Sequence, residues 1–215
     1  MSEHQHAPSP SASRFVQLAF EEQLPERPFT DPAHNALDLS NLQDMQDTLL
    51  GTLLTGRTHE ERLEHGQWPH TLHVFDPHAL QNLPELAFVG FRSILRPDAP
   101  ADIRQELSAI DAKLVEALRQ EPSPAILSYS SRQLDPFNWL NLVVLKDLSH
   151  MGYWQHSAHH QRASQHLSPH YYQGIRLHNG LLKGGIQGTL QLVSTKYYDF
   201  SADRPWLAIR TSLKR

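Results

Sequence analysis

Hydrophobic and polar positions follow two periods along the chain, and each change of period marks an expected element. Apolar runs of strand length predict strands at residues 15–20, 71–75, 86–95, 125–133, 138–147 and 189–200. Helical spacing of apolar residues predicts helices that begin at Ser40, Asp98, Ser149 and Ser168. In the first of these helices Leu42, Met45 and Leu49 share one side, so we expect that side to be buried.

Shorter segments predict the local structure between these elements. Residues 58–65 are polar and predict a helical turn, whereas residues 76–84 predict a turn bounded by prolines. The helix that begins at Ser168 should stop at Asn179 and Gly180 in a left-handed conformation. Residues 183–188 contain a Gly-Gly pair and predict a flexible connector before the last strand.

From residue 85 onward the expected order is β-α-β-β-α-β. This order predicts an α+β fold of the ferredoxin-like type, in which one face of an antiparallel sheet carries both helices. The expected organisation is a disordered tail (1–13), a helical and strand extension (14–84), the ferredoxin-like domain (85–200) and a C-terminal extension (201–215). The other sheet face is apolar and needs a cover, either a second subunit or the first 80 residues.

Composition narrows the class of protein. The chain has 215 residues, no cysteine, and a formal charge of −4 from 19 basic and 23 acidic side chains without a basic stripe. We therefore expect no disulfide framework, no thiolate-ligated metal and no nucleic-acid partner. No apolar run reaches the roughly 20 residues that cross a bilayer, and no secretory signal is visible, so we expect a cytoplasmic protein without a membrane partner.

A strand and the helix after it carry a family resemblance. Residues 138–147 (NWLNLVVLKD) form an apolar strand, and a Trp-x-x-Ser-x-x-His pattern follows it at Trp154, Ser157 and His160. In this setting, residues 85–200 resemble the dimeric α+β barrel superfamily, and within it the antibiotic-biosynthesis monooxygenase-like and haem-degrading monooxygenase-like domains. The resemblance implies a homodimeric barrel, oxidoreductase chemistry and a pocket between sheet and helices for an aromatic small molecule.

The resemblance also suggests site residues. Asn141 could hydrogen-bond the anion that develops on a substrate while Trp139 flanks its ring, with His160 as a third catalytic residue. The alternative for the pair is a packed indole and an amide at a strand edge. Trp154 is expected to be a core residue that also borders the substrate. These residues would suit an oxygenase that uses no cofactor.

Haem is the alternative cofactor. The haem-degrading branch places its axial histidine where this chain has Ser164, so His159 or His160 would have to bind the iron. A metal shared by His156 and His160 needs a third ligand that the spacing does not supply, so we predict no metal site.

One further cluster lies beyond the resemblance. Arg176 and His178 could hold an anionic ligand at a pocket mouth, or tie a connector to the sheet edge. Three functions stay open: a monooxygenase-like enzyme acting on an aromatic or polycyclic small molecule, a haem-binding protein, and a non-catalytic barrel that serves assembly or ligand binding. No serine-hydrolase elbow or phosphate loop is present in the sequence.

Overall fold

A single sheet runs through the described part of the chain, with the strand order β1-β9-β8-β7-β4-β6-β5-β3-β2. The computed structural model describes residues 15–57, 61–65, 68–120, 125–150, 158–202 and 204–212. The strands are β1 (Val16–Leu18), β2 (Glu61–His65), β3 (Trp68–Val74), β4 (Glu85–Leu95), β5 (Ile126–Gln133), β6 (Trp139–Leu145), β7 (Tyr172–Lys183), β8 (Thr189–Asp199) and β9 (Trp206–Thr211). Neighbouring strands are antiparallel, except that β1 and β9 are parallel.

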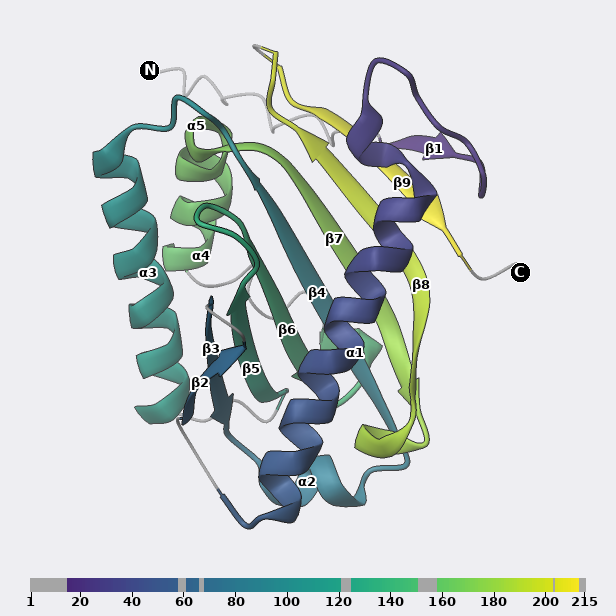
Figure 1. Ribbon diagram of the computed structural model, residues 1–215, viewed down its shortest axis with the longest axis vertical. Helices are drawn as coiled ribbons and strands as arrows, with labels where there is room; N and C mark the ends of the chain where they lie inside the picture. Colours follow the sequence, from purple (N-terminus) through teal and green to yellow (C-terminus); the bar gives the residue numbers. More distant parts are fainter. Residues whose placement is uncertain are drawn as a thin grey trace, which may run out of the picture.

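Helices lie on both faces of this sheet (Figure 1). The α-helices are α1 (Pro32–Leu54), α2 (Pro77–Asn82), α3 (Ala101–Gln120), α4 (Ala158–Gln161) and α5 (Ser168–Tyr171). Two single-turn 3-10 helices are η1 (Pro28–Thr30) and η4 (Gly185–Gln187), and η3 (Arg162–Leu167) is a π-helix. The fold is therefore α+β, as predicted. No helix among these described segments is long and apolar enough to cross a membrane.

The expected β-α-β-β-α-β order is present, but its last strand differs from the prediction. The order runs β4-α3-β5-β6, then α4 with η3 and α5, then β7, and these strands lie in the order β7-β4-β6-β5. Residues 172–183 were predicted to be mostly helical and instead form β7. The predicted last strand, residues 189–200, is β8, which pairs outside β7 as an addition to the four.

The helix prediction over residues 168–180 is wrong beyond Tyr171. Its Tyr-Tyr pair, Ile175 and Leu177 favour a strand, and pairing with β4 on one side and β8 on the other satisfies the backbone of β7. Gly180 lies inside the strand, where an added Cβ would be 2.2 Å from Phe88 Cε1, so the position requires glycine for close approach. The Gly184-Gly185 turn has positive φ angles of 94° and 69°, which agrees with the predicted permissive backbone.

Three predictions for the first 84 residues also need correction. The first helix begins at Pro32, because Asp31 is its N-cap and accepts a hydrogen bond from the Ala33 N–H at 2.8 Å, so Ser40 lies inside it. Residues 61–65 form β2, which pairs with β3, in place of a helical turn. Residues 77–82 form α2, capped by Asp76, in place of a simple turn.

Two apolar clusters show which helix covers which face. Leu42, Met45 and Leu49 of α1 pack against even-numbered β4 and β6 residues, including Phe88 and Leu142. On the other face, Val115 and Leu118 of α3 pack against odd-numbered residues of the same strands, which are Ala87, Val143 and Leu145. α1 crosses one face obliquely, while α3, α4 and α5 are grouped together (Figure 1).

The apolar sheet face is thus covered by the N-terminal part of the same chain. Gly90 permits the close approach, since a Cβ there would be 2.5 Å from Leu42 Cδ1. Gln46 of α1 also donates hydrogen bonds to the carbonyl oxygens of Ile186 and Gly188, at 2.8 and 2.6 Å. The sequence left two covers open for this face, and the structure shows that α1 covers it. The homodimer stays a prediction, and the apolar sheet face no longer supports it.

Candidate functional site

Two arginines lie directly opposite each other on adjacent strands beneath α1. Arg92 of β4 pairs in register with Arg176 of β7. The same row continues through Leu140 of β6 to Arg132 of β5. Since side chains in register point to the same face, this row turns three guanidinium groups toward α1.

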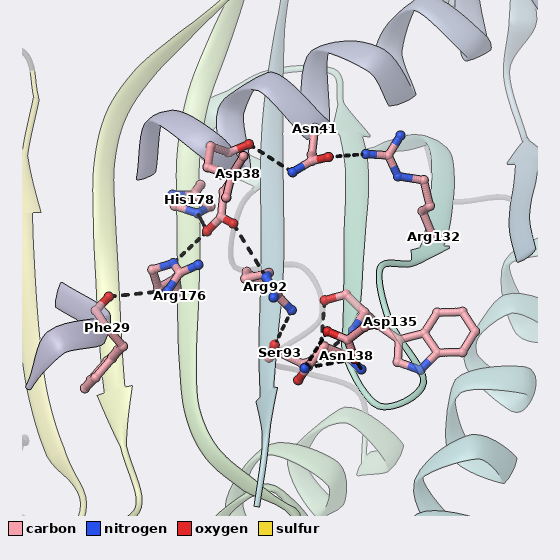
Figure 2. A network of polar contacts seen from close by, with 12 residues as sticks. Phe29, Asp38, Asn41, Arg92, Ser93, Arg132, Asp135, Asn138, Arg176 and His178 are labelled. Atoms are coloured by element: carbon pink, nitrogen blue, oxygen red, sulfur yellow. Dashed lines mark hydrogen bonds and ion pairs between the residues drawn. The ribbon is translucent and has the colours of Figure 1, made fainter. Parts of the chain in front are cut away.

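Asp38 of α1 reaches between these two arginines (Figure 2). Its Oδ2 accepts a hydrogen bond from Arg176 Nε at 2.6 Å and lies 3.0 Å from His178 Nε2. Its Oδ1 lies 3.6 Å from Arg92 Nε. His178 Nδ1 in turn lies 3.0 Å from Thr195 Oγ1, so this imidazole is fixed on both sides. One buried carboxylate thus contacts two guanidinium groups and one imidazole.

Helical spacing explains how α1 supplies its part of the site. His34, Leu37, Asp38 and Asn41 lie at positions that share one side of a helix, and all four line one cavity. Further along the same side Leu42, Met45 and Leu49 enter the apolar core. The buried side of α1 therefore carries the polar groups of the site in its first half, and in its second half it is mostly apolar, with Gln46 as a buried polar residue.

Burial and charge shift the pKa values of this cluster in definite directions. Burial would raise the pKa of Asp38, but the hydrogen bonds from His178 and Arg176 outweigh it and hold the pKa below its usual 3.8. Burial lowers the pKa of His178 below its usual 6.5, against the opposing effect of Asp38. Burial also lowers the pKa of Arg92, and the charge of Arg176 adds to that effect. Asp38 is therefore a carboxylate at neutral pH, and His178 is neutral.

A cavity of about 370 Å³ opens beside this cluster. Its polar lining is His34, Asp38, Asn41, Arg92 and Arg176, and its apolar lining is Phe29, Leu37, Ile94 and Leu134. Arg92 donates from Nη1 to the Ser93 carbonyl oxygen at 2.6 Å, and Arg176 Nη1 reaches the Phe29 carbonyl oxygen at 3.4 Å. The second amino group, Nη2, of both arginines has no hydrogen-bond partner among the described residues.

Positive charge exceeds negative charge on this buried face. The Arg132 side chain is 3% exposed, yet the nearest carboxylate, Asp44 Oδ2, is 3.9 Å away and belongs to a side chain that is 53% exposed. Arg132 donates to Asn41 Oδ1 at 2.6 Å, while its buried Nε has no hydrogen-bond partner within the described ranges. Buried guanidinium groups normally have a carboxylate or another anion beside them. The arrangement therefore suits an anionic ligand.

Arg176 and His178 are two predicted site residues that share Asp38 as a partner, but only Arg176 lines the cavity, whereas His178 is fully buried behind it. The sequence suggested that they hold an anion at a pocket mouth or tie a connector to a sheet edge. They lie inside β7, in the middle of the sheet, and Asp38 connects them.

Asn141 and Trp139, the predicted catalytic pair, lie on the opposite face of β6. They share the side of Val143 and Leu145, which is covered by α3. Asn141 Oδ1 accepts a hydrogen bond from Ser131 Oγ at 2.8 Å, and both side chains are partly buried. Nearby on that face Tyr129 donates to Asp111 Oδ1 of α3 at 2.8 Å.

The predicted histidine site falls partly outside the described residues. Trp154 and His156 belong to residues 151–157, which are not described, and for His159 only the backbone is. His160 lies in α4, is partly buried, and has its pKa lowered by burial. Within the described ranges no group of three or more histidine and acidic side chains could hold a metal ion.

Asp38, Arg92 and Asn41 were not predicted from the sequence. The signal available in the sequence was a charged residue at a position that shares the buried side of its element. Asp38 lies four residues before Leu42 of the predicted helix, and Arg92 lies two residues after Gly90 in an apolar strand.

Comparison with known proteins found no matching family model, no matching curated protein and no matching solved structure. The assignment of this site therefore rests on its own geometry.

Proposed function

We propose that this protein binds a small organic anion, with an apolar body, in the cavity between α1 and strands β4 and β7. The carboxylate or equivalent group of the ligand would lie between Arg92 and Arg176, and its body would lie against Phe29, Ile94 and Leu134. Guanidinium groups suit this role because their planar donors match the two oxygens of a carboxylate.

The observation that carries this proposal is the in-register pair of arginines with one shared carboxylate. Like charges directly opposite on neighbouring strands destabilise a sheet, so a pair of this kind needs compensation. Asp38 supplies one negative charge, and a bound anion would supply the second.

The size and lining of the cavity support a small ligand. About 370 Å³ lies at the lower end of the roughly 300–1,000 Å³ range of ligand pockets, which mix apolar walls with a few polar groups. The apolar walls suit a hydrocarbon or aromatic body, so inorganic ions alone would leave them in contact with water.

Calorimetric titration with three carboxylates of increasing apolar size (acetate, hexanoate and benzoate) tests the proposal. Hexanoate or benzoate should bind more tightly than acetate, and neutral benzamide should bind at least about tenfold more weakly than benzoate. Arg92→Gln should weaken carboxylate binding about tenfold or more, since it removes the more exposed of the two guanidinium groups.

Arg104→Gln is the matched control, because Arg104 is an exposed residue of α3 on the other side of the sheet. It should leave binding unchanged. Absence of binding for all three carboxylates, or equal binding in the Arg92→Gln variant, would contradict the proposal.

We keep a monooxygenase-like activity on an aromatic substrate as a second proposal, together with the ferredoxin-like classification predicted for residues 85–200, whose four strands would be β4, β5, β6 and β7. It is favoured by the orientation of Asn141, whose oxygen is occupied by Ser131, so that its Nδ2 is left to donate toward a substrate oxygen. Phe91 and Tyr172, whose rings meet edge to face at 5.7 Å, add aromatic surface on that side.

Oxygen consumption with hydroxylated polycyclic aromatics tests this second proposal, and Asn141→Leu should abolish it while Arg92→Gln leaves it intact. Haem binding is checked separately by titration with haem, where a Soret band that disappears on joint substitution of His159 and His160 is the expected sign. Absence of oxygen consumption would reject the monooxygenase-like activity, and absence of a Soret band would reject haem binding.

A further inference from the structure

We infer that Asp38 sets the charge of the ligand, so that the cavity accepts a singly charged carboxylate and rejects a doubly charged anion. This inference rests on the proposed anion-binding function and specifies the substrate class of the same site: monoanions with an apolar body.

The charges that line the cavity give the first argument. Its lining contains two guanidinium groups, those of Arg92 and Arg176, and one carboxylate, that of Asp38. These three groups leave one unbalanced positive charge, and the remaining ionisable group of the lining is the imidazole of His34. A monoanion would neutralise that positive charge, whereas a dianion would bring a charge that no lining residue matches.

The other charged groups nearby, Asp135, Asp44 and Arg132, do not line the cavity. Asp135 attracts Arg92 from the β5–β6 turn, but it does not line the cavity, and its effect on Arg92 is smaller than that of Asp38. Asp44 is the only carboxylate within ion-pair distance of Arg132 among the described residues, and neither side chain lines the cavity. The charge balance of the cavity lining itself is therefore set by Arg92, Arg176 and Asp38.

The position of the Asp38 carboxylate gives the second argument. Its two oxygens are held by Arg176, His178 and Arg92, and its side chain is 2% exposed. It cannot turn away to make room for a second anionic group without leaving these partners. Its charge is therefore a permanent part of the site, and only the unengaged Nη2 groups of the two arginines remain for the ligand.

An amine-bearing ligand fits this site poorly for the same reason. An ammonium group would face a positive lining, because the one carboxylate is already shared among three partners. The inferred class therefore excludes zwitterions such as free amino acids as well as dianions.

The test compares anions that share one aromatic body: benzoate, phthalate and phenyl phosphate, titrated calorimetrically at pH 8, where phthalate and phenyl phosphate carry two charges. In the unmodified protein benzoate should bind about tenfold or more tightly than either dianion. In the Asp38→Asn variant, which raises the lining charge by one, the order should reverse in favour of the dianions.

Arg104→Gln serves again as the control and should keep the order of the unmodified protein. If Asp38→Asn fails to fold, the order of the three anions in the unmodified protein decides the question. Dianions that bind the unmodified protein as tightly as benzoate, or an unchanged order in a folded Asp38→Asn variant, would overturn the inference. Failure of all anions to bind would instead reject the anion-binding function on which it rests.

Discussion

Arg92 and Arg176 face each other in register across β4 and β7, and Asp38 of α1 lies between them. Stability alone would not favour this pair, because like charges in register repel and a buried guanidinium loses its hydration. The arrangement agrees with the proposed binding site, in which a bound anion would complete the charge balance. Local departures of this kind from the rules of stable folding are common at functional sites.

The first prediction concerns the response of stability to acid. The folded-state pKa of His178 is below 6.5, so the unfolded chain takes up a proton before the folded chain does as the pH falls. The stability that depends on a neutral His178 is present above about pH 6.5 and is lost below it. In His178→Gln, which can keep both hydrogen bonds, the fall in unfolding free energy between pH 6.5 and 5 should be shallower, by up to about 1.4 kcal/mol per pH unit.

Urea unfolding at four pH values from 5.0 to 7.5 measures this difference. The same substitution at His78, an exposed residue of α2, controls for the loss of one histidine. Equal slopes for the unmodified protein and the His178→Gln variant would contradict the prediction.

The second prediction concerns Asp111 on the opposite sheet face. Burial raises the pKa of its carboxyl group, so the folded protein holds this proton more tightly than the unfolded chain. Its ionised form therefore costs stability at neutral pH, and the cost disappears as the pH falls through the folded and then the unfolded pKa. Asp111→Asn, which can still accept from Tyr129, should gain a few tenths of a kcal/mol at pH 7. The value is small because the residue as a whole is exposed and only its contact with Tyr129 is partly buried.

Thermal unfolding at pH 7 and at pH 3.5 checks this prediction for Asp111→Asn. The gain should be present at the first pH and absent at the second. An identical gain at both pH values would show that the cause is not ionisation.

The third prediction compares two glycines. At Gly180 an added Cβ would lie 2.4 Å from the Gln191 carbonyl oxygen as well as 2.2 Å from Phe88, and the backbone contact cannot give way. Gly180→Ala should therefore destabilise the protein by about 3 kcal/mol or more. At Gly51 of α1 nothing lies within 4 Å of an added Cβ, so Gly51→Ala should stabilise by about 0.5–1 kcal/mol through helix propensity. Urea unfolding of both variants tests this contrast, and similar effects at the two positions would contradict it.

The fourth prediction concerns the start of α1. Asp31 caps the helix by accepting from the Ala33 N–H, and its second oxygen accepts from Gln23 Nε2 at 2.8 Å. Asp31→Ala should cost about 1 kcal/mol of stability, and Asp31→Asn much less, because asparagine is also a good cap. Denaturant unfolding of the two variants separates loss of the cap from loss of the charge. Equal costs would assign the effect to charge.

Part of this fold could be predicted from local patterns. β4, α3, β5 and β6 were located to within a few residues, because each has a clear period and begins or ends at a turn or proline signal. The segment from Ser168 to Gly180 failed because its aromatic and aliphatic residues suit either a helix or a strand, and pairing with β4 and β8 decided the outcome. Similarly, β2 is polar and exists through its pairing with β3.

The candidate site shows the same division. The sequence contains the arginine and histidine of β7, and their spacing of two residues already placed them on one face of any strand that contains them. Residue order along the chain cannot show that Asp38, 138 positions away from Arg176, lies between two strands, because that contact depends on how α1 crosses the sheet. The pattern of neighbouring residues thus determines most helices and strands and which side of each is buried. The charge balance of the cavity is decided only by the tertiary structure, because it requires α1, β4 and β7 to bury Asp38, Arg92 and Arg176 together, away from water.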